Sequence, residues 1–526
     1  MKIDQAPHND PEVWALYHEG NTKGVFQLES NLGKSWSKKV KPNNIEELAG
    51  LVSIIRPGTL KAKQGDKTLS QIYVDRKHGI EPIEYLHESL EEILSNTYGV
   101  LVYQEQAMRI AQKLARFSES DADVLRKAIG KKKADLMAAV RKDFITGCEK
   151  VGIVDADTAN QIFDWIEKSA RYSFNKSHAV AYAINSYWSA FRKTHNTKEF
   201  FVAWLQYAKE KQDPHQEVYE LVSASKLFDF EIKTPKITNF KDEFNYYKGA
   251  IYFGLKDIKS LTGKNGDKAI KAVEELKNKL GKKIESTSWL EILIYFSTEV
   301  NSTVFKTLAS IGFFRGLKDK VTRNQAIYEY EIFRILTKTE LAWVEEHYPK
   351  RRWKSLLECF EDLAPTKKEG GGTFKESRKQ IILNEIKMLK NPPYDLSDDP
   401  DWVIDQETKF LGCPVSMSKI DTVDAAGCNT TCKELIDGKR GKNLRIAANI
   451  TRIVNFKIKK DGPSKGKEMA FLTVEDDTCA LDSVVVFPEC REENKYSLFE
   501  GNNVILQGSC EKKDDTSFIV EKIFEL

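Results

Sequence analysis

The sequence predicts a multidomain protein that is mainly α-helical and ends in a small all-β barrel. Helical spacing of apolar residues dominates as far as about residue 360. Alternation of apolar and polar residues, which is typical of strands, takes over in roughly the last 85 positions. The length of 526 residues requires several domains, because single hydrophobic cores usually stop growing at about 250–300 residues.

Residues 1–232 are expected to form the first, mainly helical domain. Residues 103–116 place apolar side chains on one helical face (Ala107, Ile110, Ala111, Leu114) and cations on the other (Arg109, Lys113, Arg116). Ser118 and Asp121 have the spacing of a capping box and predict a helix that ends near Gly130. Further helices are predicted from Asp155, with Ala159, Ile162, Phe163 and Ile166 buried, and over residues 176–195.

Two segments of the next region, residues 233–360, place glycines between apolar helical ends. The first contains Gly263 and Gly266, with Lys264 between them, and the second runs from Val304 to Gly316. Residues 361–440 contain three consecutive glycines, 370–372, and an Asn391-Pro392-Pro393 turn. We therefore expect a linker and an irregular connecting element there.

Residues 441–526 predict five strands with a short helix, Arg491 to Phe499, after the third. The alternating positions begin at Leu444, Leu472, Val484, Val504 and Phe518, and turns are expected at Gly462-Pro463 and Asp514-Asp515. This order suggests an OB-fold, a small barrel that often holds single-stranded nucleic acid, although other small barrels fit the same strand count.

Charge and cysteine content place few limits on function. A formal net charge of +3 neither supports nor excludes nucleic-acid binding, because local basic faces can be cancelled elsewhere. Of the eight cysteines only Cys428 and Cys432 are close, and no second Cys or His pair completes a zinc site. No secretion signal and no apolar run of roughly 18 residues is present, so reduced thiols in the cytoplasm are expected.

Residues 125–133 combine five cations with one glycine at a predicted helix end: Arg126, Lys127, Lys131, Lys132 and Lys133. Such cations suit the negative end of the helix dipole and would then be a solvated cap. They equally suit a phosphate-binding surface, where Arg offers bidentate contacts and Lys a point charge. The spacing alone leaves both interpretations open.

Residues 171–182 open a helix with aromatic, amide, cationic and imidazole side chains in close succession. Tyr172 or Phe174 could stack on a base, while Lys176 and His178 could contact a triphosphate. In the alternative interpretation Tyr172 and Phe174 belong to the core, and Asn175 or Ser177 is the N-cap.

Several segments together resemble the ordered signatures of the C-family DNA polymerase III alpha subunit of bacteria. The matching segments are Gly24 to Ser30, Ile55 to Gly58, Asp75 to Gly79, Thr97 to Gln106, Leu125 to Lys133 and Phe174 to His178. They cover residues 10–210 densely and in register, and the later glycine segments and barrel follow in the family's order. Several motifs in register are far more specific than any one of them.

The resemblance implies a fingers domain (1–232), a tandem helix-hairpin-helix DNA-binding region (233–360), a connecting element (361–440) and an OB domain (441–526). It implies that Arg126, Tyr172 and His178 face the incoming dNTP, with Lys127, Lys131, Lys132, Lys133, Asn175 and Lys176 as neighbouring phosphate- or DNA-facing residues. Gly263, Lys264 and Gly266 would approach duplex phosphates. Lys127 stands where the family usually has a second arginine, and Ser173 where it usually has glycine, so a bidentate contact at Lys127 is in doubt.

The family's transfer step uses three palm aspartates that hold two Mg²⁺ ions, and the resemblance places them before the Gly24 motif. The Asp-x-Asp pairs of this chain are expected to be helix starts or a loop instead: Asp121/Asp123, Asp155/Asp157 and Asp399/Asp401. We therefore expect the N-terminal polymerase half, with its palm, on a separate polypeptide in a bacterial cell, as in a phage-encoded or rearranged gene. A truncated polymerase and a non-catalytic DNA-binding module are the alternatives. Residues 370–382 show no convincing clamp-binding motif, so binding to a sliding clamp is left open.

Overall fold

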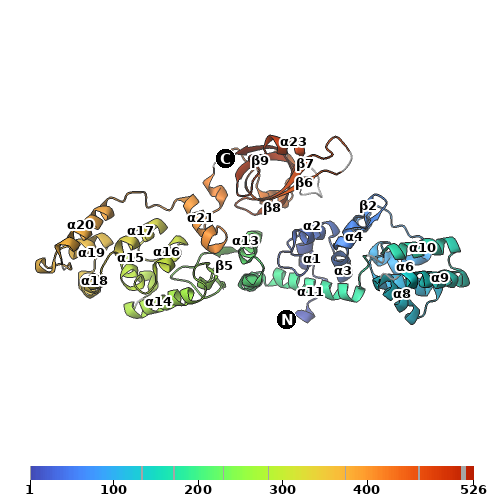
Figure 1. Cartoon of the computed structure of the whole chain (residues 1–526), viewed down its shortest axis with the longest axis horizontal. Helices are drawn as coiled ribbons and strands as arrows, with labels where there is room; N and C mark the ends of the chain where they lie inside the picture. The colour runs from blue at the N-terminus through green and yellow to red at the C-terminus, as the bar shows by residue number, and fades with distance from the viewer. Residues whose placement is uncertain are drawn as a thin grey trace. The chain divides into compact units, whose positions relative to one another are not determined.

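The computed structural model describes residues 2–131, 134–169, 172–228, 230–281, 283–373, 375–423, 425–459, 462–510 and 517–525. The chain divides into two compact units, Met1–Phe200 and Phe201–Leu526, and helix α12 (Thr197–Tyr207) spans the division. Each unit contains hydrophobic cores of its own. Figure 1 shows helices through most of the chain and the main group of strands late in it, which confirms the predicted fold class.

The first core of unit one is built around α11 (Lys176–His195). This helix packs against α1 (Pro11–His18) and α3 (Ile45–Ile54), and its Ala183, Tyr187 and Ala190 are completely buried. The same region contains α2 (Asn31–Val40), α4 (Pro57–Lys61), α5 (Leu69–Lys77) and a short ladder of β1 (Lys63–Gln64) with β2 (Lys67–Thr68). The helix predicted over residues 176–195 is confirmed.

The second core of unit one joins five helices: α6 (Glu91–Leu94), α7 (Gln104–Ala115), α8 (Glu119–Lys131), α9 (Ala134–Val151) and α10 (Ala156–Ser169). The apolar stripes predicted for α7 and α10 are buried in it. The capping box is also confirmed, because the Ser118 amide donates to Asp121 Oδ2 at 3.1 Å and the Asp121 amide donates to Ser118 Oγ at 3.2 Å. Predicted periodicity and observed packing agree throughout this part.

Unit two begins with helices and a small sheet that the sequence did not predict. Strands β3 (Glu231–Lys233), β5 (Ala250–Tyr252) and β4 (Asn245–Tyr247) are neighbours in that order, β3 parallel and β4 antiparallel to β5. Three-residue strands are too short to show a period of two. The helices of this region are α13 (Pro214–Ser225), α14 (Lys264–Leu280), α15 (Trp289–Glu291), a π-helical turn (Ile292–Phe296), α16 (Ser302–Ser310), α17 (Arg323–Phe333), α18 (Lys338–Arg351), α19 (Leu356–Leu363), α20 (Glu376–Lys390), α21 (Pro400–Leu411) and α22 (Cys432–Ile436).

The three consecutive glycines, expected in a linker, lie between α19 and α20; Gly370 is exposed, whereas Gly371 and Gly372 are buried and packed. A Cβ on Gly371 would come within 1.9 Å of the Pro365 carbonyl oxygen, and one on Gly372 within 2.7 Å of the Trp343 ring. Close approach to backbone and an indole therefore explains these glycines.

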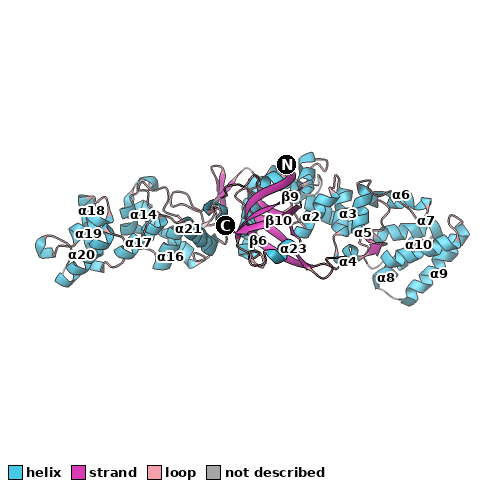
Figure 2. Cartoon of the chain, turned by 90° about the horizontal axis from the view of Figure 1, so that it is seen from above, coloured by secondary structure: helices cyan, strands magenta, loops and turns pink. Residues whose placement is uncertain are grey.

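The last core is a closed five-stranded barrel with the order β10-β8-β7-β6-β9 (Figure 2). Its strands are β6 (Gly441–Lys457), β7 (Glu468–Glu475), β8 (Ala480–Val486), β9 (Asn503–Cys510) and β10 (Phe518–Glu525). β8 and β10 are parallel and the other neighbours antiparallel, which is the strand order of an OB-like barrel. The predicted helix after the third strand is α23 (Pro488–Glu493), a few residues earlier than expected because Pro488 occupies its first position.

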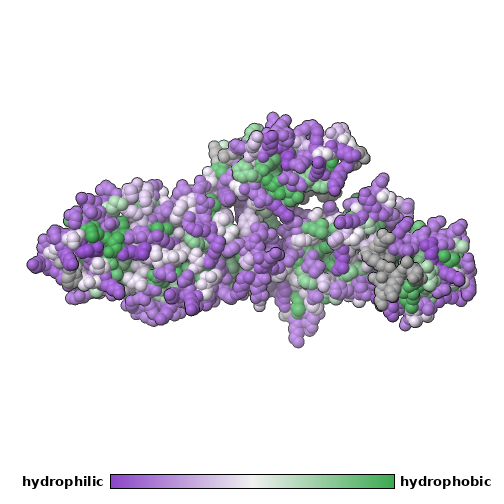
Figure 3. All heavy atoms as spheres, in the orientation of Figure 1, coloured by the Kyte–Doolittle hydropathy of each residue, from purple (hydrophilic) through white to green (hydrophobic). Residues whose placement is uncertain are grey.

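The visible face in Figure 3 is mostly hydrophilic, with hydrophobic areas of limited extent, one of them over the barrel. Within the described residues, no helix combines the length and the apolar character needed to cross a bilayer.

Candidate functional site

The start of α11 is tied to the start of α7 by backbone hydrogen bonds. The Phe174 amide donates to the Val102 carbonyl, and the Gln104 amide donates to the Phe174 carbonyl, both at 2.9 Å. Asn175 then caps α11, because its side chain accepts from the His178 amide at 2.9 Å. Of the two N-caps considered from the sequence, the structure therefore has Asn175.

Four aromatic side chains form a continuous row beside this helix start, which we call the ring set: Phe174, His178, Tyr182 and Phe26. Ring centroids are 5.4 Å apart from Phe174 to His178, 4.3 Å from His178 to Tyr182 and 5.2 Å from Tyr182 to Phe26. His178 is exposed, and Phe26 is 40% exposed. Exposed rings at such spacing offer a surface on which a base can stack.

Arg56 lies against Phe174 at one end of the ring set. The sequence alone did not indicate Arg56 as a site residue. Its guanidinium carbon lies 3.5 Å from the centroid of the Phe174 ring, a cation–π contact. Burial lowers the pKa of Arg56 from its ordinary value. The available signal was the Ile55-Arg-Pro-Gly58 motif, which lies more than 100 residues from Phe174 in the sequence, so nothing local indicated their contact.

Tyr172 and Lys176 already have intramolecular partners. Tyr172 packs against the first core, and burial raises the pKa of its hydroxyl. Lys176 Nζ lies 2.5 Å from Glu46 Oε1, and the Lys176 amide donates to Glu105 Oε2 at 2.9 Å. A phosphate at this end of α11 would have to compete with these two carboxylates.

The α8 cations converge on a single carboxylate. Asp123 Oδ1 accepts from Arg126 Nε at 2.9 Å, and its Oδ2 lies 2.8 Å from Lys127 Nζ. The hydrogen bonds from Lys127 and Arg126 lower the pKa of Asp123. The Arg126 fork is therefore partly occupied by a neighbour on its own helix.

The structure does not bring all predicted nucleotide-facing residues into one contact cluster. Arg126 and Lys127 lie on α8 of the second core, whereas Tyr172, Asn175, Lys176 and His178 lie at the α11 start beside the first core. No contact recorded for the described residues joins Arg126 to Tyr172 or His178. Both groups belong to unit one. The side chain of Lys131, and Lys132 and Lys133 as a whole, lie outside the described residues.

The first glycine hairpin has a structural reason for each of its glycines. Gly263 precedes α14 with a φ of +61°, and a Cβ on Gly266 would come within 2.3 Å of the Leu261 carbonyl oxygen. Lys264 begins α14 and is exposed. In this first turn the side chain of Lys264 is exposed, whereas Gly266 is buried.

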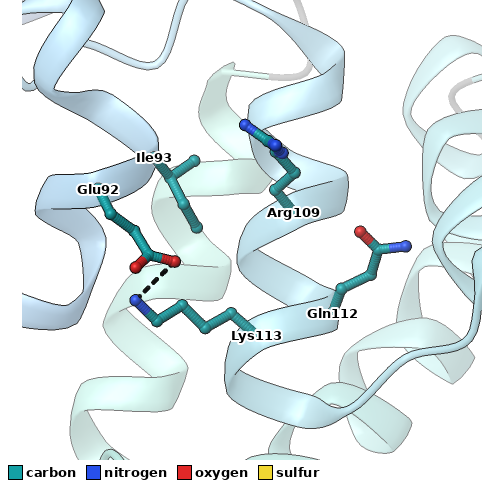
Figure 4. Close-up of a pocket in the computed structure, with 5 residues that line it drawn as sticks. All are labelled: Glu92, Ile93, Arg109, Gln112 and Lys113. Carbon is teal, nitrogen blue, oxygen red and sulfur yellow. Dashed lines mark ion pairs between the residues drawn. The ribbon is translucent and has the colours of Figure 1, made fainter.

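A shallow pocket of about 470 Å³ lies between α6 and α7 and is lined by Glu92, Ile93, Arg109, Gln112 and Lys113. Figure 4 shows Lys113 reaching Glu92, at 2.8 Å, while Arg109 and Gln112 project from α7 away from that ion pair. Lys113 is held in this ion pair, whereas Arg109 and Arg116 of the predicted basic face are exposed.

The Asp-x-Asp pairs cap helices. Asp155 Oδ1 accepts from the Thr158 amide at 2.7 Å, and Asp399 Oδ1 accepts from the Trp402 amide at 2.9 Å. In the part of the chain that the structure describes, no group of three or more His, Cys, Asp or Glu side chains is placed to hold a metal ion. These residues do not fit a magnesium centre.

Residues 1–152 match the model of the bacterial DNA polymerase III alpha subunit finger domain. The chain is 32% identical over 529 aligned residues to the DNA polymerase III subunit alpha of Aquifex aeolicus, covering 99% of this chain and 39% of that protein. The corresponding proteins of Bacillus subtilis and Thermus aquaticus are each 29% identical, over 99% and 100% of the chain and 42% and 39% of the relative. The chain thus spans about two fifths of the length of these relatives.

Proposed function

We propose that this chain binds an incoming dNTP and primer–template DNA during template-directed DNA synthesis. The proposal starts from its relationship, over nearly its whole length, to the fingers-to-C-terminal portion of bacterial DNA polymerase III alpha subunits. The observation that carries this proposal is the α11 start, where the ring set and Arg56 come together from three separate segments of unit one.

The nucleotide would be held by its base and its phosphates at different places. The base stacks beside the exposed His178 and Phe26, since every nucleobase offers a flat π-face to an aromatic side chain. The phosphates engage Arg126 and Lys127, which release Asp123 when a more highly charged ligand arrives. Lys176 would contact the phosphates more weakly, because it is already paired with Glu46.

DNA would be held by the glycine hairpin and the barrel. Lys264, exposed in the first turn of α14, would contact duplex phosphates. On the barrel, Phe456 and Phe471 are exposed with ring centroids 6.4 Å apart, and the same pair of strands carries the exposed Lys457, with Lys467 just before β7. Aromatic side chains next to cations suit single-stranded nucleic acid.

We propose that a palm domain on a partner polypeptide supplies the magnesium-holding carboxylates, while Asp155 and Asp399 of this chain cap helices. Metal ions held by that palm would help to activate the primer hydroxyl and to stabilise the leaving pyrophosphate. The part of this chain is to bind and orient the nucleotide and the DNA.

The proposal is tested by mixing the chain with a palm-bearing polypeptide and measuring dNTP incorporation on a primed template. We expect no synthesis by the chain alone, and synthesis by the mixture that R126A lowers about 10- to 100-fold in kcat/KM, the usual value of a charge-assisted contact. R109A, which removes an exposed arginine from the neighbouring α7, is the matched control and should change incorporation less than threefold.

A non-catalytic DNA-binding module is the competing function. It predicts salt-sensitive DNA binding by the chain while R126A and H178A leave every incorporation rate unchanged. A mixture that binds primed template but incorporates nothing with any palm-bearing partner would favour this alternative over the polymerase proposal.

A further inference from the structure

The loop between α1 and α2 has a shape that displays one aromatic side chain. Gly24 and Gln27 adopt positive φ values, +77° and +66°. Val25 and Leu28 are completely buried, whereas Phe26 between them is 40% exposed and meets Tyr182 of α11. The loop therefore anchors its two apolar residues and turns Phe26 outward into the ring set.

The shape of this loop is fixed from within by a lysine of α11. Lys193 is 1% exposed, and its Nζ donates to the carbonyl oxygens of Asn21 and Lys23, each at 2.8 Å. Thr22 Oγ1 donates to the Leu28 carbonyl at 2.6 Å, which ties the two ends of the loop together. Lys193 thus holds a segment that is about 170 positions away in the sequence.

One helix therefore supports both the ring set and the loop that completes it. Tyr182 and Lys193 are 11 residues apart on α11, about 16 Å along the helix axis. A buried ammonium group is costly unless its hydrogen bonds are made. The cost is offset here by two backbone carbonyls that an apolar side chain would leave without this donor.

We propose that Lys193 is a positioning residue for nucleotide binding: it fixes residues 21–28 so that Phe26 completes the surface on which the base of the incoming nucleoside triphosphate stacks. Phe26 contacts the base, and Lys193 acts only through Phe26. This inference rests on the proposed function, and it assigns to a buried cation a part in substrate affinity in addition to its part in stability.

The experiment is a double-mutant cycle between K193M and F26A in the reconstituted polymerase. Each single variant should raise the KM for dNTP about tenfold, the usual effect of losing one base-stacking partner, and change kcat less than twofold. The double variant should show no further rise, because the effect of Lys193 passes through Phe26. K193Q, which keeps N–H donors, should restore most of the affinity.

Y17F is the matched control for loss of stability. The buried Tyr17 hydroxyl of α1 shares a hydrogen bond of 3.0 Å with the Ser186 hydroxyl of α11, the helix that carries Lys193. This bond contacts neither the loop nor the ring set. Y17F should lower the melting temperature without raising the KM for dNTP. A KM that rises equally in Y17F and K193M, or additive effects of K193M and F26A, would overturn the positioning role.

Hydrogen exchange separates this inference from the proposed function. The amides of Val25 and Leu28, which donate to Thr22 and Val25 carbonyls at 2.9 and 3.0 Å, should exchange at least tenfold faster in K193M than in Y17F. Unchanged exchange would refute the role of Lys193 in the loop. Faster exchange, with no variant including H178A altering the KM, would refute the proposed nucleotide site instead. If K193M does not fold, K193A replaces it in the cycle with F26A, since its small side chain leaves room for water at the Asn21 and Lys23 carbonyls while removing the Nζ donor.

Discussion

In the proposed nucleotide site, Asp123 would compete with phosphate for Arg126 and Lys127. Its two carboxylate oxygens engage Arg126 and Lys127, so both cations carry an internal partner before any ligand arrives. An exposed ion pair of this kind is worth little to stability. Its larger consequence is competition, because a triphosphate must displace the carboxylate.

Replacing Asp123 with Asn should therefore raise the affinity for dNTP about three- to tenfold, since the two cations lose an attractive competitor. Direct binding of a labelled dNTP to the chain measures this effect. D121N is the control: Asp121 lies on the same helix but caps it through Ser118 and touches neither cation by that bond. Equal changes in both variants would mean that only the general charge of α8 matters.

Asp257 makes the stability of unit two depend on pH. Burial raises the pKa of its carboxyl to about 7, although the Phe244 and Gly254 amides donate to it and oppose the rise. Between the ordinary Asp pKa near 3.9 and about 7, the folded chain keeps a proton that the unfolded chain has released. The contribution of this group to the free energy of unfolding therefore falls as pH rises through that window.

Asp257→Asn should remove this dependence. Relative to the parent chain, the variant should become more stable by up to about 1.4 kcal/mol for each pH unit between pH 5 and 7, because Asn releases no proton. Urea unfolding of unit two at several pH values provides the measurement. Two stability curves that run parallel across this range would contradict the prediction.

At the scale of elements, long periodic helices and the barrel could be predicted from the sequence. Contacts between segments that are distant in the sequence could not. The α10 stripe from Ala159 to Ile166 shows its period directly, as do the barrel strands. Arg56 on Phe174 and Lys193 on the Asn21 carbonyl depend on how distant segments meet. The three-residue strands β3 to β5 were too short to carry a signal.

The triple glycine shows how composition alone misleads. Runs of glycine are typical of flexible linkers, but here Gly371 and Gly372 are packed between α19 and α20. A Cβ on Gly372 would come within 2.4 Å of Leu363 Cδ1 as well as meeting the Trp343 ring. At these two positions glycine is therefore required by close packing and does not indicate a flexible linker.

Gly372→Ala should lower the free energy of unfolding of unit two by about 1–3 kcal/mol, the usual cost of overpacking. Gly370→Ala is the contrast: its Cβ would meet nothing within 4 Å, but its φ is +88°, so its cost would come from backbone strain alone. Truncating Leu363 to Ala should reduce the cost of G372A and leave that of G370A unchanged. Denaturant unfolding of the three single variants and of the two double variants that carry L363A tests this distinction.

For the whole molecule, the proposal places dNTP binding and DNA binding on separate surfaces. A substitution in one surface should therefore weaken binding of one ligand and leave binding of the other unchanged. F456A and F471A remove the exposed rings of the barrel, 47% and 41% exposed, and should weaken binding of a single-stranded oligonucleotide by about 1–3 kcal/mol each. R126A should leave that affinity unchanged, and F456A should leave dNTP binding unchanged. Fluorescence anisotropy with both ligands measures this. Loss of both activities in one variant would indicate unfolding, which circular dichroism would detect.

The position of α11 also shapes how the protein is made. This helix packs against α1 and α3, yet the ribosome produces it some 120–160 residues after them. At about 5–20 residues per second, the apolar faces of those early helices wait roughly 6–32 s for their partner. During that interval nascent unit one exposes apolar surface to which a chaperone can bind. A pause in translation before α11 has left the ribosome would lengthen this exposure.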